Sequence, residues 1–480
     1  MSKLIKYILW LSVFVLAFEL PFATVAGQGL KLWMLSTLAA GLILFWNVYK
    51  SGFAWIRQSK IFLFGLGLIL FSILGLMNSP QAGYSLKQIA VLAVLIILGI
   101  FFEIFGKKKL KIIYSALAGG LLVSAAFGIY QNITFEFGWL HFEVMAARPN
   151  AFFPEADWLG LFLVLGLVPF LVWVGKDRQK SKLPKILKNK YLFYAFLTII
   201  TVTIILTVAR ASWLALLAEM GVIVMMLAYA VVIPSDSAGG VEEPLKQTER
   251  DPRLTGGQAS TKFTLSEAEG LGMTNVSILI RTIIVFFSLI FISLALINLF
   301  HLSRFNIPDR FRSIFFREHI ITVAENPATG ENFKINLEEI EKYRTQGYLI
   351  KENYITDENV ISREEKVAST WDIIKNHPVL GSGLGITLIN TNYQHNANNL
   401  FLEWWASAGL GGLALIVGLL VYLLVKGFML LKSNPQSATV ILAGTAGFII
   451  ANLFNAAIFL AFAWFYLALL AVEQGVGSRE

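Results

Sequence analysis

The sequence predicts an all-α integral membrane protein with about twelve transmembrane helices. Hydrophobic residues make up 56% of the chain and charged residues 15%, whereas a soluble domain usually carries about 25% charged residues. The mean hydropathy is +0.67. Apolar runs of roughly 17 to 25 residues recur along the chain, and in lipid only a helix satisfies every backbone group over that length. Most of the chain is therefore expected to lie in a bilayer.

The apolar runs predict the individual spans in order. They lie near residues 4–22, 30–48, 61–78, 87–105, 110–131, 157–175, 191–208, 211–233, 277–300, 398–425, 436–455 and 456–473. The first run follows Lys3 and Lys6 and also resembles a signal peptide, but the string of later spans favours an uncleaved helix. No internal repeat is evident.

Basic residues alternate between the predicted loops and set the expected topology. They gather after the second span (Lys50, Arg57, Lys60), after the fourth (Lys107 to Lys111) and after the sixth (Lys176 to Lys190). By the positive-inside rule these loops and both termini are cytoplasmic. The net charge of +8 thus belongs to membrane topology, and no nucleic-acid partner is expected.

Two long polar segments divide the chain into three parts. Residues 1–301 hold the first nine spans and include a segment at 234–276, rich in Gly, Ser, Thr, Glu and Lys, that is expected to be a flexible cytoplasmic linker. Residues 302–397 form one long external, periplasmic loop, which is too long to be a simple connection. Residues 398–480 hold the last three spans.

The external loop is expected to carry short amphipathic helices. The stretch from Arg310 to Arg317 alternates aromatic and basic residues beside a span, as in an interfacial helix whose arginines reach lipid headgroups. Capping boxes predict one helix from Asn336 to Gly347 and a second from Ser362 to the His377-Pro378 pair.

Three ionisable residues stand close to the predicted external surface. Arg210 lies in a very short connection between two spans, and Arg148 precedes a span in a turn with Glu155 and Asp157. An arginine at such a place either snorkels or pairs locally, or it binds a ligand. The third residue is His395. If the tenth helix begins near Asn396, then His395, Asn399 and Glu403 are four residues apart and share one side. A histidine beside a carboxylate can act as a general base, although a lone histidine at a helix entrance is more often a cap or a surface residue.

A longer pattern around these residues resembles the O-antigen ligase and polymerase family. It comprises Arg363 through Trp371, His377-Pro378-Val-Leu-Gly381-Ser-Gly383-Leu-Gly385, His395-Asn396 through Leu402-Glu403, and Gly409-Leu-Gly-Gly412. The family also has an arginine in a short external turn, as in Ala209-Arg210-Ala211-Ser212, and an earlier external arginine before a span, as Arg148 provides. The resemblance covers roughly residues 140 to 430. The turn after Arg148 lacks the family's usual glycine, and the loop has a polar insertion near 325–360.

This resemblance implies a GT-C-like helical fold and a glycosyltransferase of the bacterial cytoplasmic (inner) membrane, with its active site on the periplasmic side. The enzyme would transfer a glycan from undecaprenyl diphosphate to a hydroxyl of lipid A-core, another glycan or a protein. Arg148 and Arg210 would bind the diphosphate, because arginine binds phosphate bidentately and stays charged. His395 would accept the acceptor's proton, oriented by Glu403 or Asn399. Arg304, Arg310, Arg312 and Arg317 are candidates for contacts with lipid phosphates.

Other chemistries are less compatible with the residues. The chain has no cysteine, so disulfides and thiol nucleophiles are excluded, and it has no Gly-x-x-x-x-Gly-Lys-Ser/Thr motif for ATP. No convincing external Asp-x-Asp is present, so the expected mechanism needs no metal or other cofactor. A polymerase of the same family is the nearest alternative. A lipid-linked glycan flippase or other transporter is the rival from another class, but transporters usually place charges near the bilayer midplane.

Overall fold

The computed structural model describes residues 2–25, 28–53, 56–107, 109–135, 148–179, 188–232, 265–303, 305, 307–312, 318–327, 329–335, 339–356, 358–390 and 397–473. The described chain is mostly helical, and a helix overlaps each predicted span. These helices are α1 (Ser2–Phe14), α2 (Leu32–Ser51), α3 (Lys60–Gly75), α4 (Ala82–Gly106), α5 (Leu110–Thr134), α6 (Ala156–Gln179), α8 (Lys190–Leu206), α9 (Arg210–Val232), α10 (Leu265–Leu299), α15 (Leu400–Leu430), α16 (Pro435–Asn452) and α17 (Ala461–Val472).

Eight helices within the described residues are long and apolar enough to cross a membrane. They are α2, α3, α4, α5, α6, α9, α10 and α15, while α8 and α17 are apolar but shorter. The chain is thus a mostly helical, multi-pass membrane protein. The number of twelve spans and the side on which each loop lies stay predictions.

Polar side chains fix where several helices begin. The Ser59 hydroxyl accepts a hydrogen bond from the Phe62 amide at 3.0 Å, and the Glu103 carboxylate of α4 accepts the amides of Lys60 and Ile61 at 2.9 Å each. Asn189 and Asn434 cap α8 and α16 in the same way. These contacts satisfy amides that a helix leaves unpaired at its start.

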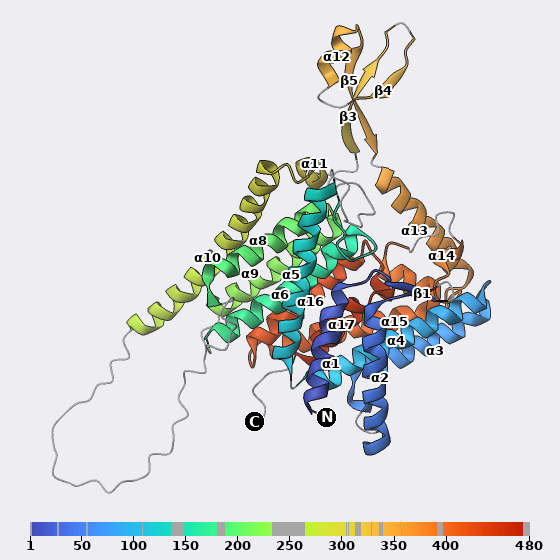
Figure 1. Cartoon of the computed structure of the whole chain (residues 1–480), viewed down its shortest axis with the longest axis vertical. Coiled ribbons are helices and arrows are strands. Elements are labelled where there is room, and N and C mark those ends of the chain that lie inside the picture. The colour runs from blue at the N-terminus through green and yellow to red at the C-terminus, as the bar shows by residue number, and fades with distance from the viewer. Residues whose placement is uncertain are drawn as a thin grey trace, which may run out of the picture.

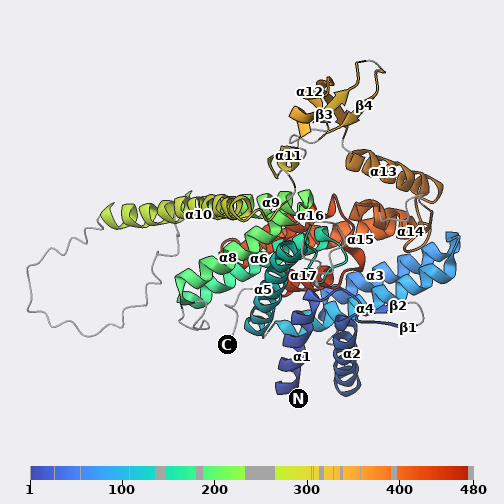
Figure 2. The same ribbon diagram turned by 45° about the horizontal axis from the view of Figure 1, so that its top comes forward.

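The core of the bundle is formed by its C-terminal helices. All residues of α17 are buried, and α17 packs against α4 while α16 packs against α9 and α15. A helix surrounded by protein need not span the bilayer alone, which accounts for the short length of α17. At the periphery, α10 contacts α8 and α9 and extends away from the other helices (Figure 2). Its Phe287 and Phe291 are exposed, as expected for a helix that faces lipid.

The two ends of the described chain lie at the same end of the bundle. The Glu473 carboxylate after α17 accepts hydrogen bonds from Tyr114 at 2.7 Å and from Ser437 at 3.0 Å, near the starts of α5 and α16. At the start of α5, burial and the nearby Lys6 ammonium of α1 lower the pKa of Lys109. The opposite end, which carries residues 302–397, is called the loop end below.

The segment after α1 is joined to the rest of the bundle. The buried Glu19 carboxylate accepts hydrogen bonds from Lys31 at 2.9 Å, from the Trp33 indole at 3.0 Å and from the Ala461 amide at 3.1 Å. Glu19 thereby connects the N-terminal region to the first turn of α17. A short hairpin, β1 (Ala23–Val25) and β2 (Gln28–Leu30), also lies here and was not predicted.

The loop end carries a small antiparallel sheet that projects from the bundle (Figure 1). Its strand order is β4-β3-β5, formed by Asn332–Lys334, Glu318–Glu325 and Leu349–Thr356. The register pairs Glu318 with Thr356 and Glu325 with Leu349. The sequence predicted only helices in this loop, and the sheet shows that this prediction was wrong for the strands β3, β4 and β5. The physical reason is that both long strands are rich in β-branched and aromatic residues, such as the Ile320-Ile-Thr-Val323 run of β3, and these residue types favour strands.

The helices of the loop end agree in part with prediction. They are α11 (Ile307–Arg312), α12 (Ile340–Thr345), α13 (Glu358–Asn376) and α14 (Thr387–Asn390). Gly347, with φ of 84°, follows α12 as predicted, and α13 ends at the predicted His377-Pro378 pair but begins before Ser362. Similarly, α10 begins at Leu265, so residues 265–276 continue that helix instead of belonging to a flexible linker. Residues 233–264 lie outside the described residues.

Candidate functional site

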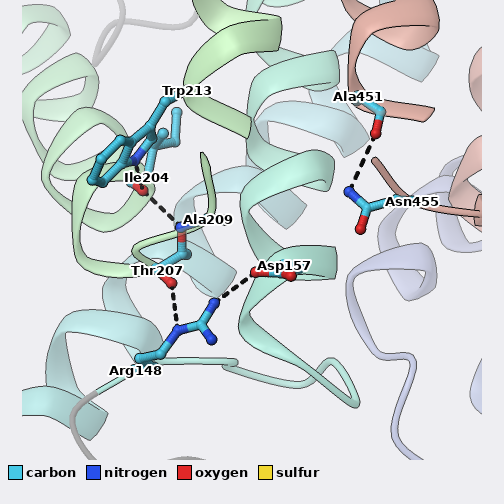
Figure 3. Close-up of polar contacts among 8 residues, drawn as sticks. All are labelled: Arg148, Asp157, Ile204, Thr207, Ala209, Trp213, Ala451 and Asn455. Atoms are coloured by element: carbon cyan, nitrogen blue, oxygen red, sulfur yellow. Dashed lines mark hydrogen bonds and ion pairs between the residues drawn. The ribbon is translucent and has the colours of Figure 1, made fainter. Parts of the chain in front are cut away.

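The two predicted arginine turns meet at the loop end. The Arg148 Nε donates a hydrogen bond to the Thr207 carbonyl at 2.9 Å. The Nη2 of Arg148 forms an ion pair with Asp157 at 2.6 Å (Figure 3). Thr207 comes three residues before Arg210. The turn before α6 is thus fastened to the turn between α8 and α9, and Arg148 is already engaged by protein groups.

A buried glutamine fixes the turn that follows Arg148. The Gln131 side-chain oxygen of α5 accepts hydrogen bonds from the Asn150 amide at 3.1 Å and from the Ala151 amide at 2.7 Å. Gln131 is fully buried. Because buried amides require partners, these bonds determine how the chain passes from Arg148 to α6.

The turn before Arg210 is compact and strained. Thr207 donates its hydroxyl to the Ile204 carbonyl at 2.7 Å, and the Trp213 indole donates to the same carbonyl at 3.1 Å (Figure 3). Val208 has a φ of 52°, a conformation that is rare for a β-branched side chain. The packing of Trp213 holds this turn, and α9 therefore starts directly at Arg210.

Backbone strain recurs in the loops of this region. Among the described non-glycine residues, four have positive φ: Ala151, Val208, His301 and Asn398. Ala151 follows Arg148, Val208 precedes Arg210, and Asn398 follows the segment that contains His395. Strained residues of this kind often cluster at functional sites, because surrounding structure must hold them in place.

A cavity of about 560 Å³ lies beside these loops. Its lining combines two arginines and a glutamate with apolar and amide groups, namely Arg210, Ala211 and Leu214 of α9, Arg363, Glu364, Val367, Ala368 and Trp371 of α13, and Asn398, Leu453 and Phe454. Arginine binds phosphate oxygens in a bidentate manner. The lining thus suits a molecule that has an anionic part and an apolar part.

The polar end of α16 shapes one wall of this cavity. The Asn452 side-chain oxygen accepts the Ala457 amide at 3.1 Å, and the Asn455 side chain donates to the Ala451 carbonyl at 3.3 Å (Figure 3). These bonds end the helix and place Leu453 and Phe454 beside the cavity.

Helix α13 brings a further cation to the region. Burial, and to a lesser extent the neighbouring Arg363, lower the pKa of Lys366, whereas Glu155 partly opposes this change. Glu155, in the turn after Arg148, therefore lies within electrostatic reach of α13. The loop helix and the arginine turns form one connected charged region.

Glu403 lies at the start of α15 and is completely buried. Both of its carboxyl oxygens lie 2.8 Å from the Thr387 hydroxyl, and one accepts the Ala397 amide at 3.0 Å. Glu403 thus anchors the chain two residues after His395. His395 itself lies outside the described residues, so its predicted contact with Glu403 stays a prediction.

The helix start near Asn396, on which the expected alignment of His395, Asn399 and Glu403 depends, is wrong. Helix α15 begins at Leu400, and Asn399 is its cap, with its side chain accepting the Phe401 and Leu402 amides at 3.0 and 3.1 Å. The positive φ of Asn398 and the capping bonds of Asn399 stop the helix before it reaches residue 396. Asn399 also donates to the Leu453 carbonyl at 3.1 Å, so it connects α15 to the cavity wall.

No model of a known protein family and no curated protein sequence matches this chain. The site must therefore be interpreted from its own geometry. That geometry brings together Arg210 and the Arg148 turn, as the sequence suggested, and adds residues that the sequence analysis left without a role: Arg363, Glu364, Lys366 and Asn398.

A helical-face argument could have found Arg363. Arg363, Val367 and Trp371 are four residues apart in α13 and all line the cavity. Residues four apart share a face of a helix, so the face that carries Val367 and Trp371 reaches Arg363 one turn earlier.

Of the four remaining predicted arginines, the structure describes Arg310 and Arg312. Arg304 and Arg317 lie outside the described residues. Arg310 stacks over the Phe305 ring at 5.1 Å, and Phe311 packs against Trp213 of α9 at 6.2 Å between ring centroids. Helix α11, which ends at Arg312, thus rests on the start of α9. Contacts of these arginines with lipid phosphates stay a prediction, and no group of three Asp, Glu or His side chains that could hold a metal occurs in the described ranges.

Proposed function

We propose that the chain transfers a glycan from undecaprenyl diphosphate to an acceptor hydroxyl at the outer surface of the bacterial cytoplasmic membrane, in the manner of an O-antigen ligase. The observation that carries the proposal is the cavity lined by Arg210 and Arg363 at the loop end of the bundle. The sequence resemblance to the ligase and polymerase family supports the same reaction. A polymerase would use the same donor with a glycan acceptor.

The charges of the region support a diphosphate leaving group. Arg210 and Arg363 line the cavity, and the Arg148 turn is bonded to the turn that precedes Arg210. Developing negative charge on a diphosphate is stabilised by preorganised arginines, since their planar groups match phosphate geometry and remain protonated. The apolar part of the lining, including Leu214 and Trp371, suits the first units of a lipid chain.

The bond changes can be assigned to these residues. The acceptor oxygen forms a bond to the anomeric carbon of the donor glycan while the bond from that carbon to the diphosphate oxygen breaks. The acceptor's proton passes to His395, and undecaprenyl diphosphate leaves with its charge held by Arg210 and Arg363, while Arg148 holds the turn that precedes Arg210. In this proposal Glu403 is a positioning residue, because it bonds the Ala397 amide close to His395 in the sequence.

One observation favours the transport alternative. Glu219 is a buried carboxyl group inside α9, and ionisable residues within membrane spans often mark transport pathways. A flippase for a lipid-linked glycan is therefore kept as the second candidate.

The decisive experiment is glycan transfer by the purified protein in detergent, with an undecaprenyl-diphosphate oligosaccharide and EDTA present. The variants are His395→Ala, Arg210→Ala and Arg363→Ala. The matched control is Arg344→Ala in α12, since Arg344 is exposed and pairs along the helix surface with Glu341. We expect roughly a 100-fold or greater loss for each site variant and none for the control. Full activity of all folded site variants would refute the assignment. Lipid movement in proteoliposomes without any transfer would establish the flippase instead.

A further inference from the structure

Glu219 is a buried acid within α9. It lies nine residues after Arg210 in α9, about 13 Å deeper along the helix axis. Its side chain is fully buried. Within the described part of the chain, neither of its carboxyl oxygens has a hydrogen-bond partner. This contrasts with Glu19 and Glu403, which are equally buried but accept several hydrogen bonds each.

The carboxyl group packs against a glycine of the neighbouring helix. A side chain at Gly447 of α16 would collide with the Glu219 carboxyl, and one at Gly444 would collide with the Tyr466 hydroxyl. Gly444 and Gly447 are three residues apart and thus share a face of α16. The hydroxyls of Tyr466 and Thr445 are likewise buried and without a hydrogen-bond partner. Glu219 and Tyr466 are therefore two unsatisfied polar groups at one seam between α9, α16 and α17.

No cation neutralises Glu219 along the helices packed against α9. Helices α16 and α17 contain no basic or acidic residue. In α6 and α8 the charged residues lie near the helix ends, and Arg281 of α10 is exposed. The titratable group that faces Glu219 is Tyr466. An ionised carboxylate that lacks both a cation and hydrogen-bond donors is strongly disfavoured in a protein interior.

We propose that Glu219 is a proton-binding site inside the membrane, where a neutral carboxylic acid closes the seam between α9 and α16. A proton needs no additional volume, which fits a carboxyl group packed directly against glycine. Loss of the proton would place a charge at the contact and would draw in water or separate the two helices.

The seam lies beneath the candidate cavity and joins two of its walls. Helix α9 begins with Arg210 and Ala211, and α16 ends just before Leu453 and Phe454, which all line the cavity. The protonation state of Glu219 thereby determines the relative positions of α9 and α16 at the cavity. This inference goes beyond the proposed function and holds whether the cavity serves transfer or another reaction.

The test is infrared difference spectroscopy of the purified full-length protein at neutral pH. Wild type should show the carbonyl stretch of one protonated carboxylic acid that Glu219→Gln lacks. The control is Glu19→Gln, which removes a buried carboxylate that is ion-paired with Lys31 and should leave this band unchanged. If the band is absent from wild type or survives in Glu219→Gln, the proposal is overturned.

Two further measurements test the proposal without relying on the Glu219→Gln spectrum alone. Tyr466→Phe should shift the frequency of the band without removing it, since it removes a hydroxyl of the seam. The unfolded chain releases this proton at the ordinary glutamate pKa of about 4.3. Wild type should therefore lose thermal stability relative to Glu219→Gln as the pH rises above about 4. Parallel melting curves of the two proteins would contradict a bound proton.

Discussion

At the scale of single residues, the Arg148 guanidinium is the point where two loops are joined. It pairs with Asp157 in its own turn and bonds the Thr207 carbonyl of the next one. Both charged side chains are mostly buried, with exposed fractions of 17% and 24%. A charge pair in this setting is stronger than an exposed pair, because water screens it less.

We expect Arg148→Ala and Asp157→Asn each to lower the free energy of unfolding by about 1 to 3 kcal/mol, because each leaves a partly buried group without its partner. The double variant should show a coupling of about 1 kcal/mol in a mutant cycle. The comparison pair is Arg344 and Glu341, which is exposed and should show a coupling of only about 0.3 kcal/mol. Equal couplings for both pairs would mean that the Arg148 pair does not fasten the loops.

The lowered pKa of Lys366 predicts how the stability of the protein depends on pH. Burial and Arg363 lower its pKa in the folded chain, so the unfolded chain holds this proton more tightly. Below the folded pKa, burial of the charged ammonium lowers the stability by its full amount. As the pH rises from the folded pKa to the unfolded pKa, this loss of stability disappears. Wild type should therefore gain stability relative to Lys366→Gln at alkaline pH. Melting curves at a series of pH values measure this, and a constant difference between the two proteins would count against it.

At the scale of elements, glycines decide how α15 meets the segment before it. Gly409 interrupts α15 with a φ of 66°. The Leu410 amide donates to the Pro378 carbonyl at 3.1 Å, and the Gly383 amide donates to the Ser407 carbonyl at 3.0 Å. Gly381, Gly383 and Gly385 all have positive φ in the facing segment. The Pro-x-x-Gly-x-Gly motif is thus explained by close backbone packing against a kinked helix.

Gly409→Ala should destabilise the protein by at least about 2 kcal/mol, because the new side chain meets the Val379 backbone and the left-handed conformation disfavours alanine. Gly221→Ala is the matched control, since it lies inside α9 with open space around it. That change should be neutral or should stabilise by up to about 1 kcal/mol. Chemical or thermal unfolding in detergent measures both, and similar effects of the two substitutions would disprove the packing argument.

At the scale of the whole molecule, the sheet of the loop end forms a separate module. The strands β3, β4 and β5 and helix α12 make their extensive contacts with one another. Phe333, Tyr343 and Tyr348 form a cluster of edge-to-face rings within it. The bundle, by contrast, is held by the buried helices α16 and α17.

Because Glu318 pairs with Thr356, the ends of the module are adjacent and a short Gly-Ser linker can replace residues 318–356. We expect this deletion to leave the melting temperature of the bundle within about 2 °C of wild type. Gel filtration and thermal unfolding in detergent check this result. A large loss of stability would show that the module supports the bundle, and a loss of glycan transfer with an intact bundle would assign the module to the acceptor.

The sequence by itself determined the helices and the general place of the arginines. Apolar runs as long as a bilayer is thick have one stable local solution, so a helix overlaps each predicted span. The short turn at Arg210 and the stop at His377-Pro378 also follow from local rules. The sheet at 318–356 was missed because the helix-capping signals were followed and the β-branched residues of its two long strands were not considered.

Only the tertiary structure decided which of these residues share a site. Arg210 and Arg363 are far apart in the chain, and their meeting at one cavity depends on the packing of α13 against α15. The same holds for Glu219, whose unpartnered state becomes visible only when Gly447 of α16 is seen against it. Local sequence governs hydrogen bonding within a helix, whereas contacts between helices arise from packing among distant segments, and that packing brings the site together.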